Sequence, residues 1–548
     1  MQPSRAAPSS SSTVAASDRE PSPERPTQDG SKQASRRHDE ADEEAADEEG
    51  GGKPVDDEEA KRDKDGVRME DGVPMVGLTG LDDPFSPLRM SNARKWVILL
   101  VVSSAAFCVT CCSSMVSLTY DGTAREFGET SLIVMTLGIS LFVLGLGIIP
   151  QALRTRSPII AVLLGPLSEH IGRRPIYLVS YGVFIAFNFQ VAFAHNLATW
   201  LIGRFFCGMF ASPFLSVAGG SVTDLWAPDQ VASPMAFYTA SPFLGPVIGP
   251  IISGVINQHL DWRWTWYILI MWSAVEFAAL FLLVPETYLP ALLKKKAKHL
   301  RQQGRSDVRA PIELDERTPL QVVATSCLRP LQILIYEPMA LALCTWTALL
   351  LGILYMAFSA WPIVYRDHHG FSTQETGFSF TGIGVGIVIG TLMQPVWAIY
   401  YGRITKETGE RPPPEEHLRK GCWGAVLVPV SLFWFAFTSY ASVHWAVSQV
   451  STIFFGIGII LSYQAVFVYL VDAFRPVAAS AMAANSAMRS SFACVFPLFT
   501  QAMFKKLGTA GALALIAGLT CCILPFPFLF FKYGHKYRKS SRFANKER

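Results

Sequence analysis

The sequence has little charge for its length, and we expect no cleavable signal peptide. Charged residues make up only 17% of the 548 residues, whereas hydrophobic residues make up 50% and aromatic residues 12%. The N-terminus has no apolar core after its first charges, so we expect the first apolar segment to direct membrane insertion itself. This composition, with its long apolar runs, excludes an ordinary soluble domain and indicates an integral membrane protein.

The chain also lacks the residue patterns of catalysis and metal binding. It has no nucleophile–base set, no phosphate-binding loop and no metal-ligand spacing, so we expect no enzymatic activity, cofactor, metal site or nucleic-acid partner. Most of its ten cysteines lie in apolar segments, which argues against a disulfide framework. Cys108-x-x-Cys111-Cys112 could suggest a metal site, but no His or acid accompanies it. Packing between membrane helices is the favoured interpretation.

Both ends of the chain are polar, and they carry opposite charge. The first 92 residues are rich in Ser, Pro, Glu and Asp and include an acidic run at 39–49, whereas residues 532–548 are basic. So few apolar side chains cannot offset the entropy lost on folding. We therefore predict a disordered cytoplasmic tail over residues 1–92 and a basic cytoplasmic tail over 532–548.

Between these ends we count twelve apolar segments of about 20 residues, the length that crosses a bilayer core of about 30 Å. Their centres lie near residues 107, 142, 184, 209, 243 and 274, and then near 348, 388, 431, 458, 489 and 520. We predict a six-helix bundle over residues 93–288, a polar cytoplasmic connection over 289–335 and a second six-helix bundle over 336–531.

Lys and Arg gather in alternate links between these segments. They lie before the first segment, at Arg173 and Arg174, in the connection 289–335, in the link 403–419 and in the C-terminal tail. Because positively charged loops stay on the cytoplasmic side, we expect both termini of this multi-pass protein in the cytoplasm.

Several motifs resemble those of one known family. The link 165–175 reads Gly-Pro-Leu-Ser-Glu-His-Ile-Gly-Arg-Arg-Pro, and the segment 241–250 reads Ser-Pro-Phe-Leu-Gly-Pro-Val-Ile-Gly-Pro. They resemble the helix 2–3 loop motif and the helix 5 antiporter motif of the major facilitator superfamily. Further segments resemble fungal members of its 12-spanner drug:proton antiporter family: 204–208, 262–266, 285–288, 362–365, 470–473 and 478–485. The resemblance implies two helical bundles with a site between them near the membrane midplane.

In the resembled family the link 165–175 latches the cytoplasmic side closed. Glu169 and Arg173 are four residues apart, so they could pair on one helical turn. A plain positive anchor of Arg173 and Arg174 is the alternative, but it would not need the glycines. The latch residues expected here are Gly165, Glu169, Gly172, Arg173, Arg174 and Asp224.

The antiporter motif concentrates proline and glycine in one membrane segment. Proline removes a backbone hydrogen bond, and glycine permits close approach of another helix. The resemblance implies a bent helix that limits proton leak, and simple close packing is the alternative. The motif residues are Gly245, Pro246, Gly249, Pro250 and Gly254.

Three ionisable residues lie within apolar segments: Arg204, Glu276 and Arg489. A charge at the bilayer centre costs about 3 kcal/mol on insertion scales, so each is a candidate for proton or substrate coupling. Glu276 is the one clear acid deep in a segment, and buried carboxyl groups can titrate near neutral pH. Glu276 is therefore our first choice as the proton carrier, and a structural pairing with Arg204 is the alternative.

Aromatic residues could line a cavity for bulky amphiphilic substrates, although each could equally face lipid. The candidates are Tyr238, Phe243, Phe358, Trp361 and Gln464.

Together these features predict a monomeric proton-coupled antiporter that exports amphiphilic drugs, toxins or metabolites across a fungal plasma membrane. Its partners would be the lipid bilayer, small amphiphilic substrates and protons, and the proton gradient would drive it without a cofactor. A non-transporting receptor or scaffold on the same fold remains an alternative. A polyamine exporter is another, less favoured because Ser359 stands where such relatives carry an acid.

The stretch between Gly145 and Gly165 holds about eleven residues more than relatives have there. One continuous helix over 131–167 would be about 55 Å long, against a bilayer core of about 30 Å. Either the extra residues are extruded at the cytoplasmic end, or they come from a gene-model error. We favour the gene-model error.

Overall fold

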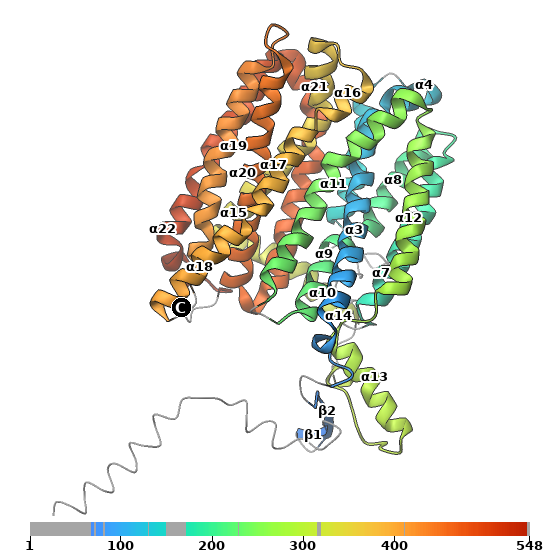
Figure 1. Cartoon of the computed structure of the whole chain (residues 1–548), viewed down its shortest axis with the longest axis vertical. Coiled ribbons are helices and arrows are strands. Elements are labelled where there is room, and N and C mark those ends of the chain that lie inside the picture. The colour runs from blue at the N-terminus through green and yellow to red at the C-terminus, as the bar shows by residue number, and fades with distance from the viewer. Residues whose placement is uncertain are drawn as a thin grey trace, which may run out of the picture. The chain divides into compact units, whose positions relative to one another are not determined.

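The computed structural model describes residues 67–70, 73–79, 83–129, 131–148, 171–227, 230–314, 319–409 and 412–544. The chain divides into two units, residues 1–61 and 62–548, and every described residue belongs to the second. Long helices dominate this unit (Figure 1), which confirms the predicted all-α class. Residues 1–66, and most of the extra residues between Gly145 and Gly165, lie outside the described part of the chain.

Six long helices, which we call the first half, cover the first six predicted segments. Ser91 and Asn196 cap the first and fourth of them, because their side chains accept hydrogen bonds from Arg94 N and Thr199 N. The long helices are α3 (Asn92–Met115), α5 (Leu132–Ile148), α7 (Arg173–Ala192), α8 (Leu197–Ala211), α11 (Ala232–His259) and α12 (Arg263–Leu283). The short elements are η2 (Val116–Leu118), α4 (Tyr120–Phe127), α9 (Pro213–Ser216) and α10 (Ala218–Leu225).

The second half covers the remaining predicted segments. Its long helices are α15 (Pro338–Trp361), α17 (Thr381–Leu392), α18 (Gln394–Thr408), α19 (Leu418–Thr438), α20 (Trp445–Ala473), α21 (Ala478–Ile523) and α22 (Pro525–Ser540). A π-helical stretch, η5 (Pro362–His368), continues α15. The short elements are α16 (Thr373–Phe378), η6 (Pro414–His417) and η7 (Arg475–Val477).

By length and composition, ten helices in the described residues could cross a membrane, or eleven if the bent pair α4–α5 counts as one span. One of the ten runs over Ser480–Lys539, which at 1.5 Å per residue is far longer than a bilayer core is thick. Gly508 breaks it, with a φ of 68° that ends the helical path inside α21. Gly508 lies between the segments predicted near residues 489 and 520, and the count of twelve spans stays a prediction.

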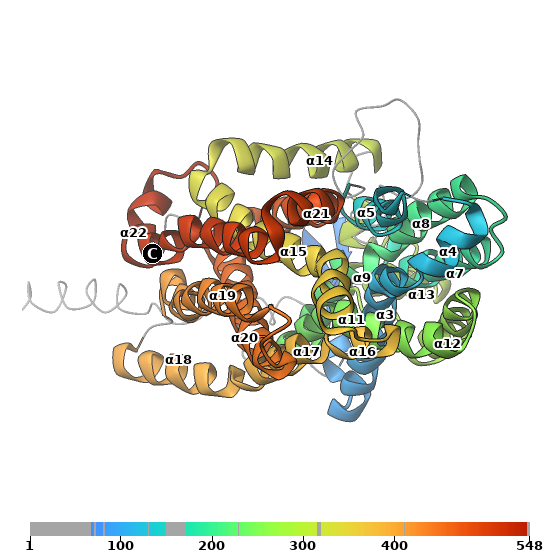
Figure 2. The same cartoon turned by 90° about the horizontal axis from the view of Figure 1, so that it is seen from above.

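The two halves meet along a small set of helices. Helix α11 packs on α16 and α17, and α5 packs on α21. Figure 2 shows α3, α7, α8 and α12 beyond α5 and α11 on one side, and α19, α20 and α22 on the other. We call the end of the bundle that holds α4 and α16 the α16 end; α10 and the last turns of α18 lie at the opposite end (Figure 1).

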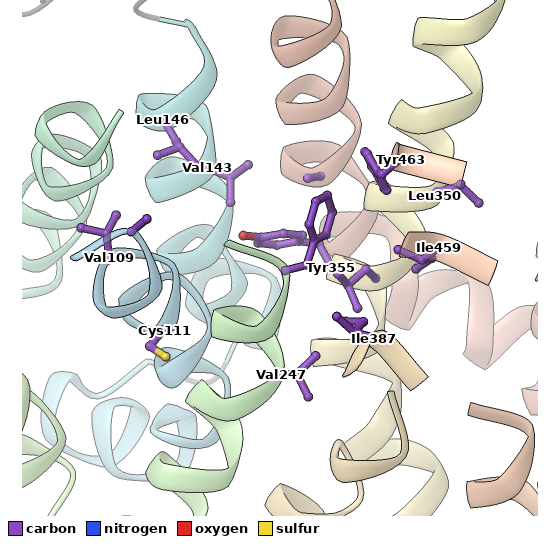
Figure 3. Packing of buried hydrophobic residues seen from close by; sticks show 14 of the residues in the cluster. Val109, Cys111, Val143, Leu146, Val247, Leu350, Tyr355, Ile387, Ile459 and Tyr463 are labelled. Carbon is purple, nitrogen blue, oxygen red and sulfur yellow. The ribbon is translucent and has the colours of Figure 1, made fainter. Parts of the chain in front are cut away.

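The interface between the halves is filled with apolar side chains. Figure 3 shows Val143 and Val247 from the first half facing Ile387 and Ile459 from the second, with Tyr355 between them. All five are buried in one continuous core cluster. This packing places the polar contact between Ser113 and Tyr355, described below, in a water-poor environment.

The predicted disordered tail, 1–92, contains regular secondary structure in its described residues, so the prediction is corrected there and stays a prediction for residues 1–66. Strands β1 (Val67–Glu70) and β2 (Val73–Val76) form an antiparallel hairpin, and η1 (Pro87–Arg89) precedes α3. The connection 289–335 also contains helices, α13 (Leu289–Gln302) and α14 (Pro319–Tyr336), with η4 (Pro311–Glu313) between them. The hairpin packs on α13 through a small apolar cluster of its own: Val67, Val76, Leu293, Ala297, Leu300, Val308 and Ala310.

A buried ion pair stabilises the unit formed by β1, β2, Asp83 and α13, which we call the hairpin–α13 module. Lys296 Nζ lies 2.6 Å from Asp83 Oδ2, and both side chains are almost fully buried. Desolvation alone would raise the pKa of Asp83, but hydrogen bonds from Lys296, Phe85 and Thr79 outweigh it and lower that pKa to about 2. The sequence prediction failed here because the apolar partner of the hairpin lies more than 200 residues further along the chain.

Candidate functional site

A cavity of about 290 Å³ lies between the halves near the α16 end. Asp121 and Arg366 both line it and form an ion pair across the halves, with Arg366 Nη1 2.6 Å from Asp121 Oδ2. The predicted cavity residue Phe358 and the neighbouring Ser359 also line it. Its other lining residues include Ser117, Tyr120, Thr136, Asp367 and Gln501.

Further contacts join the halves within the bundle. Ser113 Oγ of α3 lies 3.0 Å from Tyr355 Oη of α15, and Ser140 Oγ of α5 donates to Cys494 O of α21 at 2.7 Å. These buried hydrogen bonds connect residues 242 and 354 positions apart in the sequence. Each is a polar contact in a membrane interior, where few alternative partners exist.

The antiporter motif lies on α11, where one helix touches both halves. A Cβ atom at Gly245 would lie 2.0 Å from Thr110 Oγ1, and one at Gly249 would lie 2.1 Å from Ser114 Oγ, both on α3. A Cβ atom at Gly254 would instead lie 3.0 Å from Thr373 O, in the second half. The glycines therefore allow α11 to approach α3 over one stretch and α16 over the next.

Three prolines in α11 are spaced four residues apart: Pro242, Pro246 and Pro250. Each lacks the N–H that would bond to the carbonyl four residues earlier, so Pro246 leaves the carbonyl of Pro242 free, and Pro250 leaves that of Pro246 free. A membrane helix tolerates this when neighbouring groups or water satisfy the freed carbonyls.

Arg204 of α8 is a fully buried cation held by backbone carbonyls. Its Nε donates to Gly138 O at 3.0 Å, and its Nη atoms donate to Cys112 O at 2.9 Å and Ser113 O at 3.1 Å. Its guanidinium also lies over the rings of Phe142 and Trp266, at 4.6 and 5.1 Å. The side chain therefore joins α3, α5 and α8 inside the first half.

Glu276 of α12 does not pair with Arg204 in this structure. Its Oε2 accepts a hydrogen bond from Ser104 Oγ of α3 at 3.0 Å, and its Oε1 makes none within the described residues. Its side chain is 7% exposed, and it belongs to the packing of α12 against α3 and α7 rather than to the interface between the halves. No cation among the described residues pairs with Glu276, so within this part of the chain it can take up and release a proton without breaking an ion pair.

Arg489 of α21 has a different environment from Arg204. Its guanidinium lies over the rings of Tyr463 and Phe467 on α20, at 5.5 and 5.1 Å. Tyr463 in turn packs on the predicted cavity residue Phe243 of α11, with ring centroids 4.4 Å apart. Arg489 and Phe243 therefore approach the same tyrosine from the two halves.

The remaining predicted cavity residues are not brought together. Tyr238 Oη donates to Phe214 O at 2.8 Å inside the first half. Trp361 stacks on Phe435 at 4.8 Å inside the second half. Gln464 is only 3% exposed, and neither atom of its amide forms a hydrogen bond within the described part of the chain.

The predicted latch residues that are described meet at the start of α7. Gly172 has a φ of 107°, and a Cβ atom there would lie 2.3 Å from Glu286 Oε2. Arg173 Nε lies 3.2 Å from Asp224 Oδ2 of α10. Arg174 extends toward α12 and donates from Nη2 to Phe281 O at 2.8 Å. Gly165 and Glu169 lie outside the described residues, so their roles stay predictions.

Glu286 is a further residue of this corner that the sequence argument missed. Its carboxylate accepts hydrogen bonds from Arg173 N at 2.8 Å and Arg174 N at 3.1 Å, and so caps the first turn of α7. A negative charge at a helix N-terminus is favourable. The sequence could have indicated Glu286, because this residue belongs to the segment 285–288 that supported the family resemblance.

No group of three or more His, Cys, Asp or Glu side chains among the described residues could hold a metal ion. Cys108, Cys111 and Cys112 are free, buried thiols in α3. They contact neighbouring helices, as Cys112 does through its sulfur, 3.4 Å from Arg204 Nη1.

Two packed helical halves, polar contacts between them and charges inside the spans are the features of a multi-pass membrane transporter. A model of the Major Facilitator Superfamily matches residues 102–497. The chain belongs to this superfamily, which makes it a transporter rather than an enzyme.

Fungal relatives are similar over most of the chain. The chain is 42% identical over 477 residues to the "Efflux pump atB" of Aspergillus terreus, which covers 86% of this chain and 90% of that protein. It is 36% identical over 502 residues to the "Probable drug/proton antiporter YHK8" of Saccharomyces cerevisiae, with coverages of 89% and 94%. Among solved structures, the xylose transporter XylE from E. coli shares the fold, with a TM-score of 0.57 and 15% identity, over 81% of this chain and 98% of that one.

Proposed function

We propose that this protein exports amphiphilic small molecules across a fungal plasma membrane in exchange for protons. The observation that carries the proposal is the position of the antiporter motif, on the helix that packs against both α3 and α16. The names of two relatives, an efflux pump and a probable drug/proton antiporter, support the direction of transport and its coupling.

Alternating access would use the interface between the halves. At the α16 end this interface is held by the Asp121–Arg366 ion pair and by the approach of Gly254 to α16. If both termini are cytoplasmic, as the charge distribution favours, the α16 end faces outward. These contacts would then break each time the site opens to the outside, while the corner of Arg173, Asp224 and Glu286 serves as the cytoplasmic latch.

Glu276 is the proton carrier in this proposal, and the proton gradient is the driving force. The carboxylate of Glu276 accepts a hydrogen bond from Ser104 and pairs with no cation among the described residues, so its protonation would alter the packing of α12 on α3 without breaking an ion pair there. A monomer with no cofactor suffices for this cycle.

Efflux from living cells tests the proposal. The full chain is expressed in a yeast strain that lacks its own pumps, and the retention of a panel of fluorescent amphiphiles is measured with and without a protonophore. We expect lower retention in expressing cells, and we expect the protonophore to abolish the difference. Efflux that persists undiminished with the protonophore would refute proton coupling, and no efflux of any compound would favour a receptor or scaffold.

A further inference from the structure

The two arginines inside the membrane helices differ in how their charge is satisfied. Arg204 is fully buried, and three backbone carbonyl oxygens accept hydrogen bonds from its N–H groups. Arg489 is partly buried, and its Nε makes no hydrogen bond within the described residues. No carboxylate in the described part of the chain forms an ion pair with it. A cation in a membrane interior is costly, so its retention without a counter-charge needs a reason.

Among the described residues, the groups that interact with Arg489 are aromatic or neutral. Its guanidinium lies over Tyr463 and Phe467, and the hydroxyl of Tyr355 and the thiol of Cys344 lie within electrostatic range. Neutral groups of this kind can orient a cation but cannot neutralise it. Within the described residues the site therefore carries a net positive charge, as a binding site for an anion would.

Arg489 lies where the second half meets three helices of the first. Tyr463 packs on Phe243 of α11, and Tyr355 contacts Ser113 of α3. The next residue, Ser490, lies against Gly147 of α5, because a Cβ atom on that glycine would be 1.9 Å from the Ser490 Cβ. Figure 3 shows Tyr355 and Tyr463 in this packing between the halves. A group bound to Arg489 would thus touch the surface along which the halves must move.

Buried polar groups with unused atoms lie on the same two helices, Gln464 on α20 and Asn485 on α21. Asn485 lies one helical turn before Arg489; its Nδ2 donates to Thr347 Oγ1 at 2.7 Å, and its Oδ1 makes no hydrogen bond within the described residues. Gln464, beside Tyr463, is nearly fully buried with both amide atoms unused in the same part of the chain. Buried polar atoms without partners are uncommon in native structures and point to a missing one.

From this arrangement we propose that Arg489 binds the carboxylate of the transported molecule, so that the protein selects acidic amphiphiles. A guanidinium presents a fork of N–H groups that matches the two oxygens of a carboxylate. Phe243 and Phe467 supply aromatic surface for the apolar body of such a molecule. The inference rests on the proposed export function and names its substrate class.

Binding of a matched pair of probes to the purified full chain tests the inference. The probes are dansyl-undecanoic acid and its methyl ester, which differ in the carboxylate and share the apolar body; binding is followed by dansyl fluorescence. We expect the wild type to bind the acid at least about tenfold more tightly than the ester. Arg489→Gln should remove that preference by weakening acid binding alone, and Arg489→Lys should keep part of it, because the charge remains without the fork.

Lys505→Gln, which removes an exposed positive charge from the same helix, is the matched control and should keep the full preference. Thermal unfolding verifies that each variant is folded. If Arg489→Gln does not fold, Arg489→Lys is used in its place. An equal affinity of the wild type for both probes, or an unchanged preference in a folded Arg489→Gln, would overturn the inference.

The inference and the proposed function can fail separately. If protonophore-sensitive efflux of neutral and basic amphiphiles persists while the acid is not preferred, only the carboxylate site is refuted. If an acid of this chain neutralises Arg489 in another conformation, Arg489→Gln would lose transport of all compounds equally, and that result would also overturn the inference. Loss of all protonophore-sensitive efflux in the wild type would instead refute the proposed function.

Discussion

At the residue scale, the charges inside the membrane are satisfied by different means. Arg204 relies on carbonyl oxygens of α3 and α5, whereas Glu276 relies on one serine hydroxyl and leaves a carboxylate oxygen unused within the described residues. Because the two do not contact each other, a change in one need not leave the other as an unpaired charge. This separation makes the structural and the coupling role of Glu276 distinguishable by experiment.

Glu276→Gln should leave the protein stable and remove most of its proton-driven efflux. The amide is nearly isosteric with the acid and can still accept from Ser104, and no cation loses its partner, so we expect the free energy of unfolding to change by about 1 kcal/mol or less. Thermal unfolding and protonophore-sensitive efflux are measured on the same variant, with Glu375→Gln at an exposed site as control. Normal stability together with normal driven efflux would move the proton site elsewhere, with Asp224 and Asp472 the next candidates.

At the element scale, the hairpin–α13 module ties the N-terminal tail to the connection between the halves. Helix α13 has a buried apolar stripe and an exposed basic face, so the strands cover a surface that would otherwise face water. The module contains one buried ion pair, Lys296–Asp83, among its apolar contacts. Breaking such a pair leaves an uncompensated buried charge, which is strongly destabilising.

Asp83→Asn should loosen this module by about 3 kcal/mol at neutral pH. The pKa of Asp83 is lowered to about 2, so the pair contributes its full stability above the ordinary pKa of an aspartate, near 4, and loses it as the pH falls toward 2. Hydrogen exchange of the β1, β2 and α13 amides measures the loosening, with Asp307→Asn at an exposed site as control. Unchanged protection at pH 7 would show that the apolar cluster alone holds the module.

The elements that could be predicted from the sequence are those whose signal is local. Runs of apolar residues located the membrane helices, since a bilayer core requires about 20 such residues in succession. The hairpin could not be predicted, because its few apolar residues lie in an acidic tail and pack only on α13, far along the chain. The Asp121–Arg366 ion pair could not be predicted either, because its residues are 245 positions apart and only the packing of the halves brings them together. Motif resemblance located Arg173 and Asp224 but not the capping role of Glu286.

At the scale of the whole molecule, the two halves are held at the α16 end by contacts of modest strength. Asp121 and Arg366 are each about half exposed, and an exposed ion pair contributes about 1 kcal/mol or less. Such a pair can bias a conformational equilibrium without deciding whether the protein folds.

Asp121→Asn should therefore favour opening of the α16 end with little effect on stability. A loss of about 0.5–1 kcal/mol corresponds to a shift of about two- to fivefold in the ratio of the two states. Maleimide labelling of Ser359→Cys in the cavity, in a background without the native cysteines, reports the opening. The charge swap Asp121→Arg with Arg366→Asp should bring labelling back toward the wild-type rate. Labelling that does not change in Asp121→Asn would show that the pair does not hold the halves together.

The measurement that tests the central claim most directly is transport by the purified full chain in liposomes with an imposed pH gradient. Substrate accumulation and internal pH are followed together, the latter with a trapped pH-sensitive dye. Our account predicts that substrate accumulates only when the gradient is present, that substrate movement dissipates the gradient, and that a protonophore abolishes both effects. Equal transport with and without the gradient, and no substrate-dependent change in internal pH, would contradict proton-coupled export.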